Sequence, residues 1–262
     1  MQMGYIFADL HLESKFEYAT FSLNLVSPYL ALLGDIGNTR DDALFTFFKR
    51  MLKQYTIVFF VPGNHEPYYS DWIDAHIKLT GFEKLANQSP EPGAGKFVYL
   101  NQTRYDLTPT VTILGCVLFS AIEPRHAKTI GNGLNDFFHI KDWTVDIHCQ
   151  AHHSEVTWLK SQICEIAREE PTRSIAIFTH YCPTLDALEP KYEDSEYTSG
   201  FITDLRMEEY WRVRSVKVWA FGHTHYNYDI VEEGTGKRVV ANQRGYPGDM
   251  TNGFDPGKTI EI

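Results

Sequence analysis

Long hydrophobic runs are missing from this sequence of 262 residues. A membrane-spanning helix needs about 20 consecutive apolar residues, and no stretch of the chain approaches that length. Residues 1–9 also lack the basic segment followed by an apolar segment that is typical of a signal peptide. We therefore expect a cytoplasmic protein that does not contact a membrane.

Basic runs and closely spaced cysteines are missing as well. The formal net charge is -10, with 24 Lys and Arg against 34 Asp and Glu, so the positive field typical of a general nucleic-acid binder is not expected. The four cysteines are far apart and form no CxxC pair, which favours free thiols over a disulfide framework or a thiolate zinc site. A small or specifically bound substrate fits this composition best.

Short apolar runs alternate with longer amphipathic stretches along the chain. Strands are expected at 5–8, 29–33, 56–61, 97–100, 111–118, 174–178 and 218–221, with a hairpin over 226–231 and 238–241. Helices are expected at 41–54, 69–85, 145–169 and 204–214, and the stretch 120–136 reads as irregular. This alternation predicts an α/β protein, and we expect one domain over residues 1–262.

Polar clusters follow five of the predicted strands, where the apolar run ends. The carboxyl ends of the strands are where ligands bind in open α/β sheets, so these clusters are expected to share one cleft. Carboxylate and imidazole groups suit zinc, iron or manganese, and one shared Asp can bridge two ions. A lone histidine would more often be structural, but five ordered clusters favour a metal site. Their candidate members are Asp9, His11, Asp35, Asn64, His65, His180, His223 and His225.

The order of these clusters resembles the signature of the calcineurin-like metallophosphoesterases, which runs D-x-H, G-D, G-N-H-E/D, H and G-H-x-H. The resemblance spans residues 9–225 and every signature residue is present. It implies a four-layer α/β/β/α sandwich of two mixed sheets flanked by helices. It also implies two metal ions, Mn, Fe or Zn, with one ligand set of Asp9, His11 and His225, a second of Asn64, His180 and His223, and Asp35 as the bridge.

The resemblance further implies how such a site acts. A hydroxide bridging the two metals would attack phosphorus, and His65 would contact the phosphate together with Asn64 and protonate the leaving oxygen. Gly34, Gly63 and Gly222 precede ligands at sharp strand exits, where a side chain would crowd the metals or force a poor φ. We expect a metal-dependent hydrolase of small phosphoesters.

Two differences from known branches of this family narrow the range of expected substrates. The protein phosphatases carry an Asp-Arg pair after G-D and an Arg before G-N-H, whereas this chain has Asn38 within the first motif and Pro62 before the second. The purple acid phosphatases carry a tyrosine ligand at the position of Asn38. A phosphodiester such as a cyclic nucleotide is therefore the first expected substrate, and a nucleotide or other small phosphomonoester is the second.

Several alternatives stay open at this point. The chain could be a metal-binding scaffold of the same fold without turnover, and a nuclease conflicts with the net charge unless the fold hides a basic groove. Arg244, in a segment resembling the N-x-R-G-Y ending of small phosphoesterases, is as consistent with a structural role as with phosphate contact. The set His148, Cys149, His152 and His153 suggests a second zinc site less strongly than an exposed polar helix face. Tyr68, Tyr69 and Trp72 fit base stacking and helix packing equally well.

Overall fold

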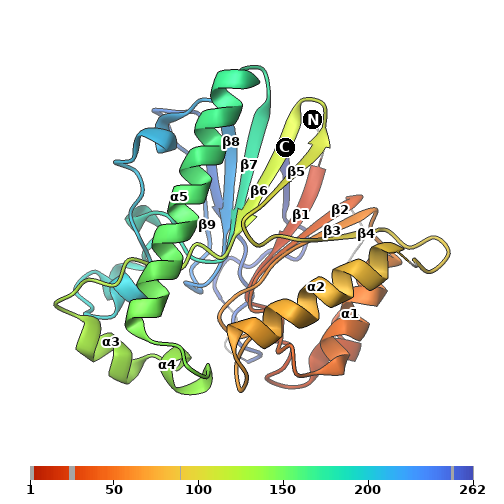
Figure 1. Cartoon of the computed structure of the whole chain (residues 1–262), viewed down its shortest axis with the longest axis horizontal. Helices are drawn as coiled ribbons and strands as arrows, with labels where there is room; N and C mark the ends of the chain where they lie inside the picture. Colours follow the sequence, from red (N-terminus) through yellow and green to blue (C-terminus); the bar gives the residue numbers. More distant parts are fainter. Residues whose placement is uncertain (1–2, 24–26, 89, 249–250, 262) are drawn as a thin grey trace.

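A computed structural model describes residues 3–23, 27–88, 90–248 and 251–261. Its centre is two mixed β-sheets that pack face to face (Figure 1). In the first sheet β1 (Met3–Phe7), β2 (Tyr29–Leu33), β3 (Ile57–Val61) and β4 (Lys96–Tyr99) are parallel, and β11 (Thr259–Glu261) pairs antiparallel with β1. Its strand order is β11-β1-β2-β3-β4.

The second sheet has the order β5-β6-β7-β8-β10-β9. Its parallel centre is β6 (Val111–Cys116), β7 (Ser174–Thr179), β8 (Val216–Phe221) and β10 (Arg238–Ala241). The antiparallel edge strands are β5 (Thr103–Thr108) and β9 (Tyr228–Val231). The predicted hairpin is thus confirmed as β9 and β10.

Helices cover the outer faces of both sheets, which gives four layers (Figure 1). The helices α1 (Asp42–Leu52) and α2 (Trp72–Gln88) cover the first sheet, and the long α5 (Val145–Glu169) covers the second. The short α3 (Ala127–Gly133) and α4 (Asp136–His139) precede α5. The described residues also contain short 3-10 helices: η1 (Glu17–Ala19), η2 (Leu185–Ala187), η3 (Pro190–Tyr192), η4 (Thr198–Gly200) and η5 (Glu209–Arg212).

Alternating side chains of the strands build separate cores on the two faces of each sheet. In β7, Ile175 and Ile177 pack toward α5, whereas Ala176 and Phe178 pack into the core between the sheets. In β1, Tyr5 and Phe7 pack into the core that α1 and α2 cover. Strands that are buried on both faces read as continuous apolar runs, which is why the sequence revealed the central ones. The predicted four-layer α/β/β/α fold is confirmed.

Three local predictions were wrong. The stretch 204–214 is not an α-helix but contains only η5, where Tyr210 and Trp211 are both buried and the carbonyl of Trp211 accepts from the buried ammonium of Lys237 at 2.6 Å, so that a tertiary contact satisfies this backbone group. The stretch predicted as irregular, 120–136, contains α3. The edge strands β5 and β11 were missed because their residues are largely half-buried or exposed. None of the described helices has the length and hydrophobicity that crossing a membrane requires.

Candidate metal centre

The residues predicted to form a site follow five strands whose carboxyl ends meet. Three of these strands, β1, β2 and β3, belong to the first sheet, and β7 and β8 belong to the second. The two sheets are joined here, because Ala8 at the end of β1 donates to the carbonyl of Asn242 and accepts from the backbone N–H of Arg244. The structure brings all eight predicted residues to this junction: Asp9, His11, Asp35, Asn64, His65, His180, His223 and His225.

A first group of metal-binding side chains is formed by Asp9, His11 and His225. The Nε2 atoms of the two histidines face each other at 2.9 Å, and Oδ1 of Asp9 lies 3.4 Å from Nε2 of His225. One ligand atom from each residue lies within 4.8 Å of the other two. Asp9 and His11 are buried, whereas 29% of the His225 side chain is exposed, so the site opens to solvent on the side of His225.

A second group is formed by Asp35, His180 and His223, whose ligand atoms also lie within 4.8 Å of one another. Oδ1 of Asn64 lies 3.0 Å from Nε2 of His180, so an amide oxygen joins the group as a further donor. The Asp35 carboxylate lies between the groups, with Oδ1 3.5 Å from Nε2 of His180 and Oδ2 3.9 Å from Nε2 of His11. One carboxylate therefore faces both clusters.

The donor atoms are arranged as a metal site requires. Nδ1 of His180 donates to the carbonyl of Leu33 at 2.8 Å, which leaves the Nε2 lone pair directed at Asp35 and Asn64. The buried Nε2 of His223 has no hydrogen-bond partner among the residues that the structure describes. An imidazole nitrogen buried without a partner is costly, and a bound ion would satisfy it. These residues fit divalent ions such as zinc, iron or manganese.

Burial keeps the histidine ligands in the neutral form that metals bind. It lowers the pKa of His11 and of His180 to about 4 each, and that of His223 well below its usual value. Burial also raises the pKa of Asp35 well above the ordinary range, with the nearby carboxylates of Glu66 and Asp9 adding to the effect. A cation beside Asp35 would offset that penalty.

The loops that carry these residues turn sharply. Asp9, His11, Asp35, His223 and His225 all have positive φ, between 46° and 75°, which is uncommon for residues other than glycine. Backbone of this kind is expected where a strand exit must aim side chains back into a site. The residues with left-handed backbone are thus the candidate ligands themselves.

Glycines permit the close approach of these loops, as predicted. A Cβ atom at Gly222 would lie 2.7 Å from Oδ2 of Asp9, and Gly34 has a φ of 86° and packs against the His180 ring. A side chain at either position would displace a donor group.

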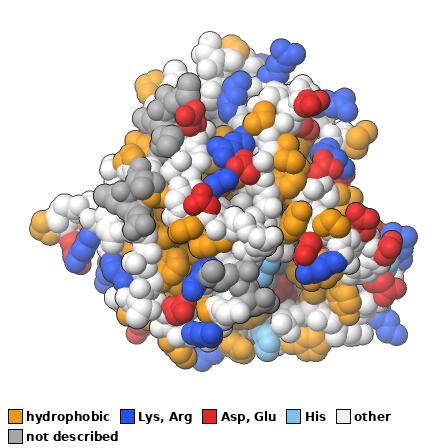
Figure 2. Space-filling view, turned by 180° about the vertical axis from the view of Figure 1, so that it is seen from behind, with side chains coloured by type: hydrophobic (Ala, Val, Ile, Leu, Met, Phe, Trp, Pro, Cys, Tyr) orange, Lys and Arg blue, Asp and Glu red, His pale blue; other side chains and the backbone are white. Residues whose placement is uncertain are grey.

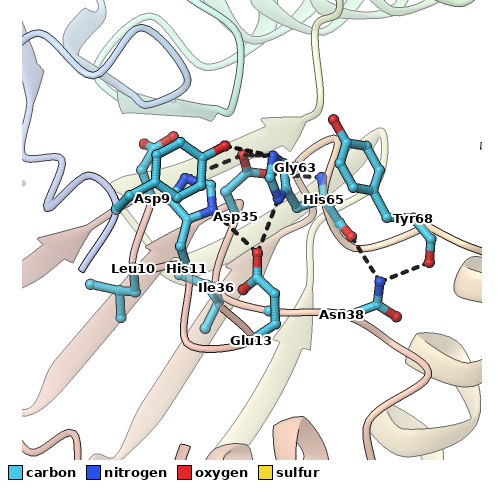
Figure 3. A network of polar contacts seen from close by, with 12 residues as sticks. Asp9, Leu10, His11, Glu13, Asp35, Ile36, Asn38, Gly63, His65 and Tyr68 are labelled. Atoms are coloured by element: carbon cyan, nitrogen blue, oxygen red, sulfur yellow. Dashed lines mark hydrogen bonds and ion pairs between the residues drawn. The ribbon is translucent and has the colours of Figure 1, made fainter. Parts of the chain in front are cut away.

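His65 lies at the edge of both groups. Its Nε2 atom is 3.8 Å from Oδ2 of Asp35, and its Nδ1 atom is 3.0 Å from Oε1 of Glu13 (Figure 3). The same Glu13 oxygen lies 3.3 Å from Nδ1 of His11, so one carboxylate orients two imidazoles and both Nε2 atoms point toward Asp35. Glu13, His11 and His65 form a third cluster of potential ligand atoms. The contacts of Glu13 with the two Nδ1 atoms explain why these atoms lie so close together.

The charge balance around Glu13 follows from these contacts. Burial would raise the pKa of Glu13, but hydrogen bonds from His11 and His65 outweigh it and lower the pKa to about 2. Burial would lower the pKa of His65, but the charge of Asp35 and the contact with Glu13 outweigh it and raise the pKa to about 9. These contacts favour the protonated form of His65 next to the two groups of metal-binding side chains.

Glu66 organises the two loops behind the site. Its buried carboxylate accepts backbone N–H groups of Asp35, Ile36, Gly37 and Gly63 at 2.6 to 3.2 Å. The sequence contained Glu66 in the G-N-H-E/D motif, but nothing in a single sequence indicates that its partners are the backbone of another loop.

Asp136 is a second residue whose role was not predicted. It accepts from the amide of Asn64 at 2.8 Å and from the hydroxyl of Tyr68 at 2.7 Å. The Tyr68 ring stacks on His65 with centroids 4.2 Å apart, so this tyrosine supports the site. Neither base stacking nor helix packing, the two roles considered from the sequence, fully describes these contacts. Trp72 packs against Phe119 and Trp143 instead.

Two residues near the C-terminus also reach the site. Gln243 is buried and accepts the backbone N–H of His225 at 2.6 Å, which fixes that ligand loop. The ring of Tyr246 stacks on His11 with centroids 4.1 Å apart, and its hydroxyl lies 3.3 Å from Nε2 of His65. Arg244 points away, pairing with Glu17 at 2.7 Å and donating to the Leu10 carbonyl, so it has the structural role.

The expectation of an exposed polar face on α5 was wrong for two histidines, although His153 is exposed. His148 and His152 are buried and bind the loop 118–120, where Nε2 of His148 accepts from the backbone of Ser120 and Nδ1 of His152 donates to the carbonyl of Leu118. That loop has positive φ at Leu118 and Phe119 and needs partners for its backbone. The residues of this set form no metal-binding group within the described ranges, and all four cysteines, which lie in those ranges, are free thiols.

Two mixed sheets in a four-layer sandwich, with clustered aspartate and histidine side chains at their joined carboxyl ends, define a metal-binding α/β sandwich protein. The calcineurin-like phosphoesterase family model matches residues 5–227, and the chain belongs to this family of hydrolases. An uncharacterized protein of Acanthamoeba polyphaga mimivirus is 26% identical over 254 residues, which cover 89% of this chain and 84% of that protein.

Solved structures include a similar fold. The phosphopantetheinyl hydrolase of Mycobacterium tuberculosis superposes with a TM-score of 0.65 at 16% identity, over 94% of this chain and 90% of that chain. At this identity the likeness concerns the fold.

Proposed function

We propose that this protein hydrolyses small phosphoesters with two bound metal ions. Asp9, His11 and His225 would hold one ion, Asn64, His180 and His223 would hold the other, and Asp35 would contact both. The observation that supports this most strongly is the Asp35 carboxylate, which lies between the two groups at 3.5 Å from Nε2 of His180 and 3.9 Å from Nε2 of His11.

Divalent ions held there would polarise the phosphate and lower the pKa of a bound water from 15.7 to about 7, so that a nucleophile is available near neutral pH. The chain supplies the groups that position and protonate the substrate. His65 would donate a proton from Nε2 to the leaving oxygen, while Glu13 holds its Nδ1 atom and fixes the ring. Asn64 would contact the phosphate beside it.

A singly charged phosphodiester fits the surroundings better than a doubly charged phosphomonoester. None of the described residues that line the two cavities next to the centre is a lysine or arginine, so beyond the proposed metal ions and His65 the chain supplies no further cation for a second phosphate charge. Thr39, at the position where protein phosphatases carry the arginine of their Asp-Arg pair, instead donates to the carbonyl of Glu66 at 2.9 Å. A cyclic nucleotide is a phosphodiester of this charge.

General nucleic-acid binding is not part of the proposal. The net charge is -10, and on the face shown in Figure 2 the Lys and Arg side chains lie interspersed with Asp and Glu. Nucleic acids are held chiefly by continuous positive surfaces. A small substrate that is recognised inside the cleft is consistent with this surface.

The experiment is turnover of bis-p-nitrophenyl phosphate and p-nitrophenyl phosphate by the purified protein loaded with Mn²⁺ or Zn²⁺. Both should be hydrolysed, the diester faster, and His65→Ala should lower kcat by about 100-fold or more while metal binding is kept. Asp35→Asn should abolish both metal binding and turnover. Stoichiometric metal binding with no turnover of either ester would contradict the proposal and indicate a scaffold.

A further inference from the structure

Two cavities flank the candidate metal centre and share one wall. The larger, of about 420 Å³, extends from His223 and His225 to the segment that carries η2, η3 and η4. The smaller, of about 220 Å³, lies beside His65 and Glu13. Tyr246 lines both cavities, and its ring stacks on His11 between them.

The larger cavity is apolar and aromatic. Its lining includes the side chains Leu134, Leu188, Tyr192, Tyr197, Phe201 and Ile202. The Phe201 ring stacks on His223 with centroids 4.9 Å apart, so the apolar wall reaches the metal-binding group directly. Cavities of this size and lining hold uncharged organic groups.

The charged residues of the larger cavity also favour an uncharged group. Apart from histidines, Glu189 is the one charged residue among the described residues that line it. Its carboxylate pairs with Lys191 at 2.8 Å, and the lysine ammonium is itself 59% exposed and lies outside the lining. An anionic group in this cavity would therefore find no lysine or arginine in the lining to pair with, whereas an apolar group needs no such partner.

The smaller cavity contains the proton donor. His65 lines it together with Tyr68 and Asn38, and the cavity is about half the volume of the other. An ester oxygen that takes a proton from His65 must leave on this side. The group that stays on phosphorus would then extend into the larger cavity.

We propose that the substrate is a phosphodiester with two different ester groups: an uncharged, apolar group in the cavity of Leu188 and Phe201, and a smaller leaving alcohol beside His65. This inference rests on the proposed phosphoesterase function. In the reaction the oxygen of one water forms a bond to phosphorus, and the bond from phosphorus to the oxygen beside His65 breaks. That oxygen takes a proton from His65, which the proton released by the water restores. The products are the free small alcohol and the phosphomonoester of the apolar group.

The test is a series of p-nitrophenyl phosphodiesters that differ only in the second group: methyl, hexyl and 5-carboxypentyl. With the Mn²⁺-loaded protein, kcat/KM from p-nitrophenolate release should be about tenfold or more higher for hexyl than for methyl, because each buried methylene adds favourable transfer free energy. The carboxylate should return kcat/KM to near the methyl value. Glu189→Gln should raise kcat/KM for the carboxypentyl ester without changing that for the hexyl ester.

A matched pair of variants locates the effect. Leu188→Ala removes a side chain from the cavity wall and should lower the hexyl-to-methyl ratio by about threefold or more. Leu185→Ala removes the same side chain from the neighbouring 3-10 turn, where it is 43% exposed and outside the cavity, and should leave the ratio unchanged. Equal kcat/KM for hexyl and methyl esters, or equal effects of the two variants, would overturn the inference.

Calorimetric binding of hexyl phosphate and methyl phosphate separates this inference from the proposed function. Tighter binding of hexyl phosphate, lost in Leu188→Ala and kept in Leu185→Ala, supports the apolar cavity even if no ester is hydrolysed. Absence of turnover throughout would then contradict the proposed function alone, whereas equal affinities for the two phosphates would contradict the cavity assignment alone.

Discussion

The carboxylate of Asp136 holds the side-chain amide of Asn64, with 2.8 Å between Oδ1 of the aspartate and Nδ2 of the asparagine. This contact fixes which end of the amide points inward, because the nitrogen is occupied and the oxygen is left facing His180 at 3.0 Å. Hydroxyl groups of Tyr68 and Tyr181 donate to the same carboxylate. The amide oxygen that faces the second group of candidate ligands is thereby oriented from a distant part of the chain.

Asp136→Ala should therefore weaken metal binding. Without the carboxylate the Asn64 amide is free to rotate, and loss of a residue that orients a ligand typically lowers metal affinity by about 10- to 100-fold. Titration of the metal-free protein with Mn²⁺ or Zn²⁺ should show this loss for one of two ions. Asp142→Ala, where 86% of the side chain is exposed, is the control, and equal affinities in the two variants would refute the prediction.

Glu66→Ala should destabilise the fold even without metal. The change leaves four buried backbone N–H groups without their acceptor, and each such group costs about 1–3 kcal/mol. We expect the free energy of unfolding in EDTA to fall by at least about 3 kcal/mol, measured by urea denaturation. Glu193→Ala, on the exposed loop, should change it by less than about 0.5 kcal/mol. A similar small change in Glu66→Ala would show that water satisfies these groups.

Glu155 should make stability depend on pH. Burial raises its pKa to about 8 from an ordinary value of 4.5, with partial relief from backbone N–H groups of Leu118 and Val117. Between pH 5 and 8 the folded protein keeps a proton that the unfolded chain has released, so this residue's contribution to stability is lost as pH rises through that window. In Glu155→Gln the side chain does not titrate, so this pH dependence of the free energy of unfolding is absent.

The comparison of the two proteins at pH 5 and pH 8 isolates the effect of Glu155. Relative to wild type, Glu155→Gln should gain at least about 2 kcal/mol of unfolding free energy at pH 8 compared with pH 5. Parallel stability curves across this range would mean that the carboxyl group titrates normally.

Glu13→Gln should slow turnover through His65. The glutamate oxygen lies 3.0 Å from Nδ1 of His65 and 3.3 Å from Nδ1 of His11, and an amide replaces this charged contact with a neutral one. We expect kcat for the p-nitrophenyl diester to fall by about 10- to 100-fold with little change in KM. A fall in metal occupancy of the same size would instead assign the effect to His11, so metal content is measured alongside.

Metal removal should lower thermal stability reversibly. The candidate ligands come together only in the folded protein, so ions bound there at 100 times their dissociation constant would stabilise it by about 2.7 kcal/mol. EDTA should lower Tm by several degrees, and Mn²⁺ or Zn²⁺ in excess should restore it. Asp35→Asn should show no such recovery. An unchanged Tm in wild type would argue against metal binding.

The positions of the candidate ligands were predictable because each lies just after an apolar strand. Asp9, Asp35 and His180 are recognisable from local sequence, and the parallel sheet then brings the strand ends together. The same reasoning identified Gly34 and Gly222 as positions without room for a side chain. Local signals were sufficient wherever the chemistry sits beside a strand end.

The supporting residues were not predictable, because their partners are remote and often backbone. No periodicity links Asp136 to Asn64, and the four N–H groups bound by Glu66 leave no mark in the sequence. His148 and His152 were assigned to solvent from their polarity, although the left-handed backbone at Leu118 requires buried partners. Polarity predicts exposure only where no irregular backbone has to be satisfied.

The junction of Ala8 with the segment after β10 has a consequence for how the protein is made. Asp9, His11, Asp35 and Asn64 leave the ribosome while His180, His223 and His225 are still untranslated, an interval of several seconds at about 5–20 residues per second. During translation only a partial, oxygen-rich donor set is exposed to the ions of the cell. Three of the four candidate imidazole ligands join last, so the identity of the bound metal would be decided after synthesis, when the second sheet docks on the first.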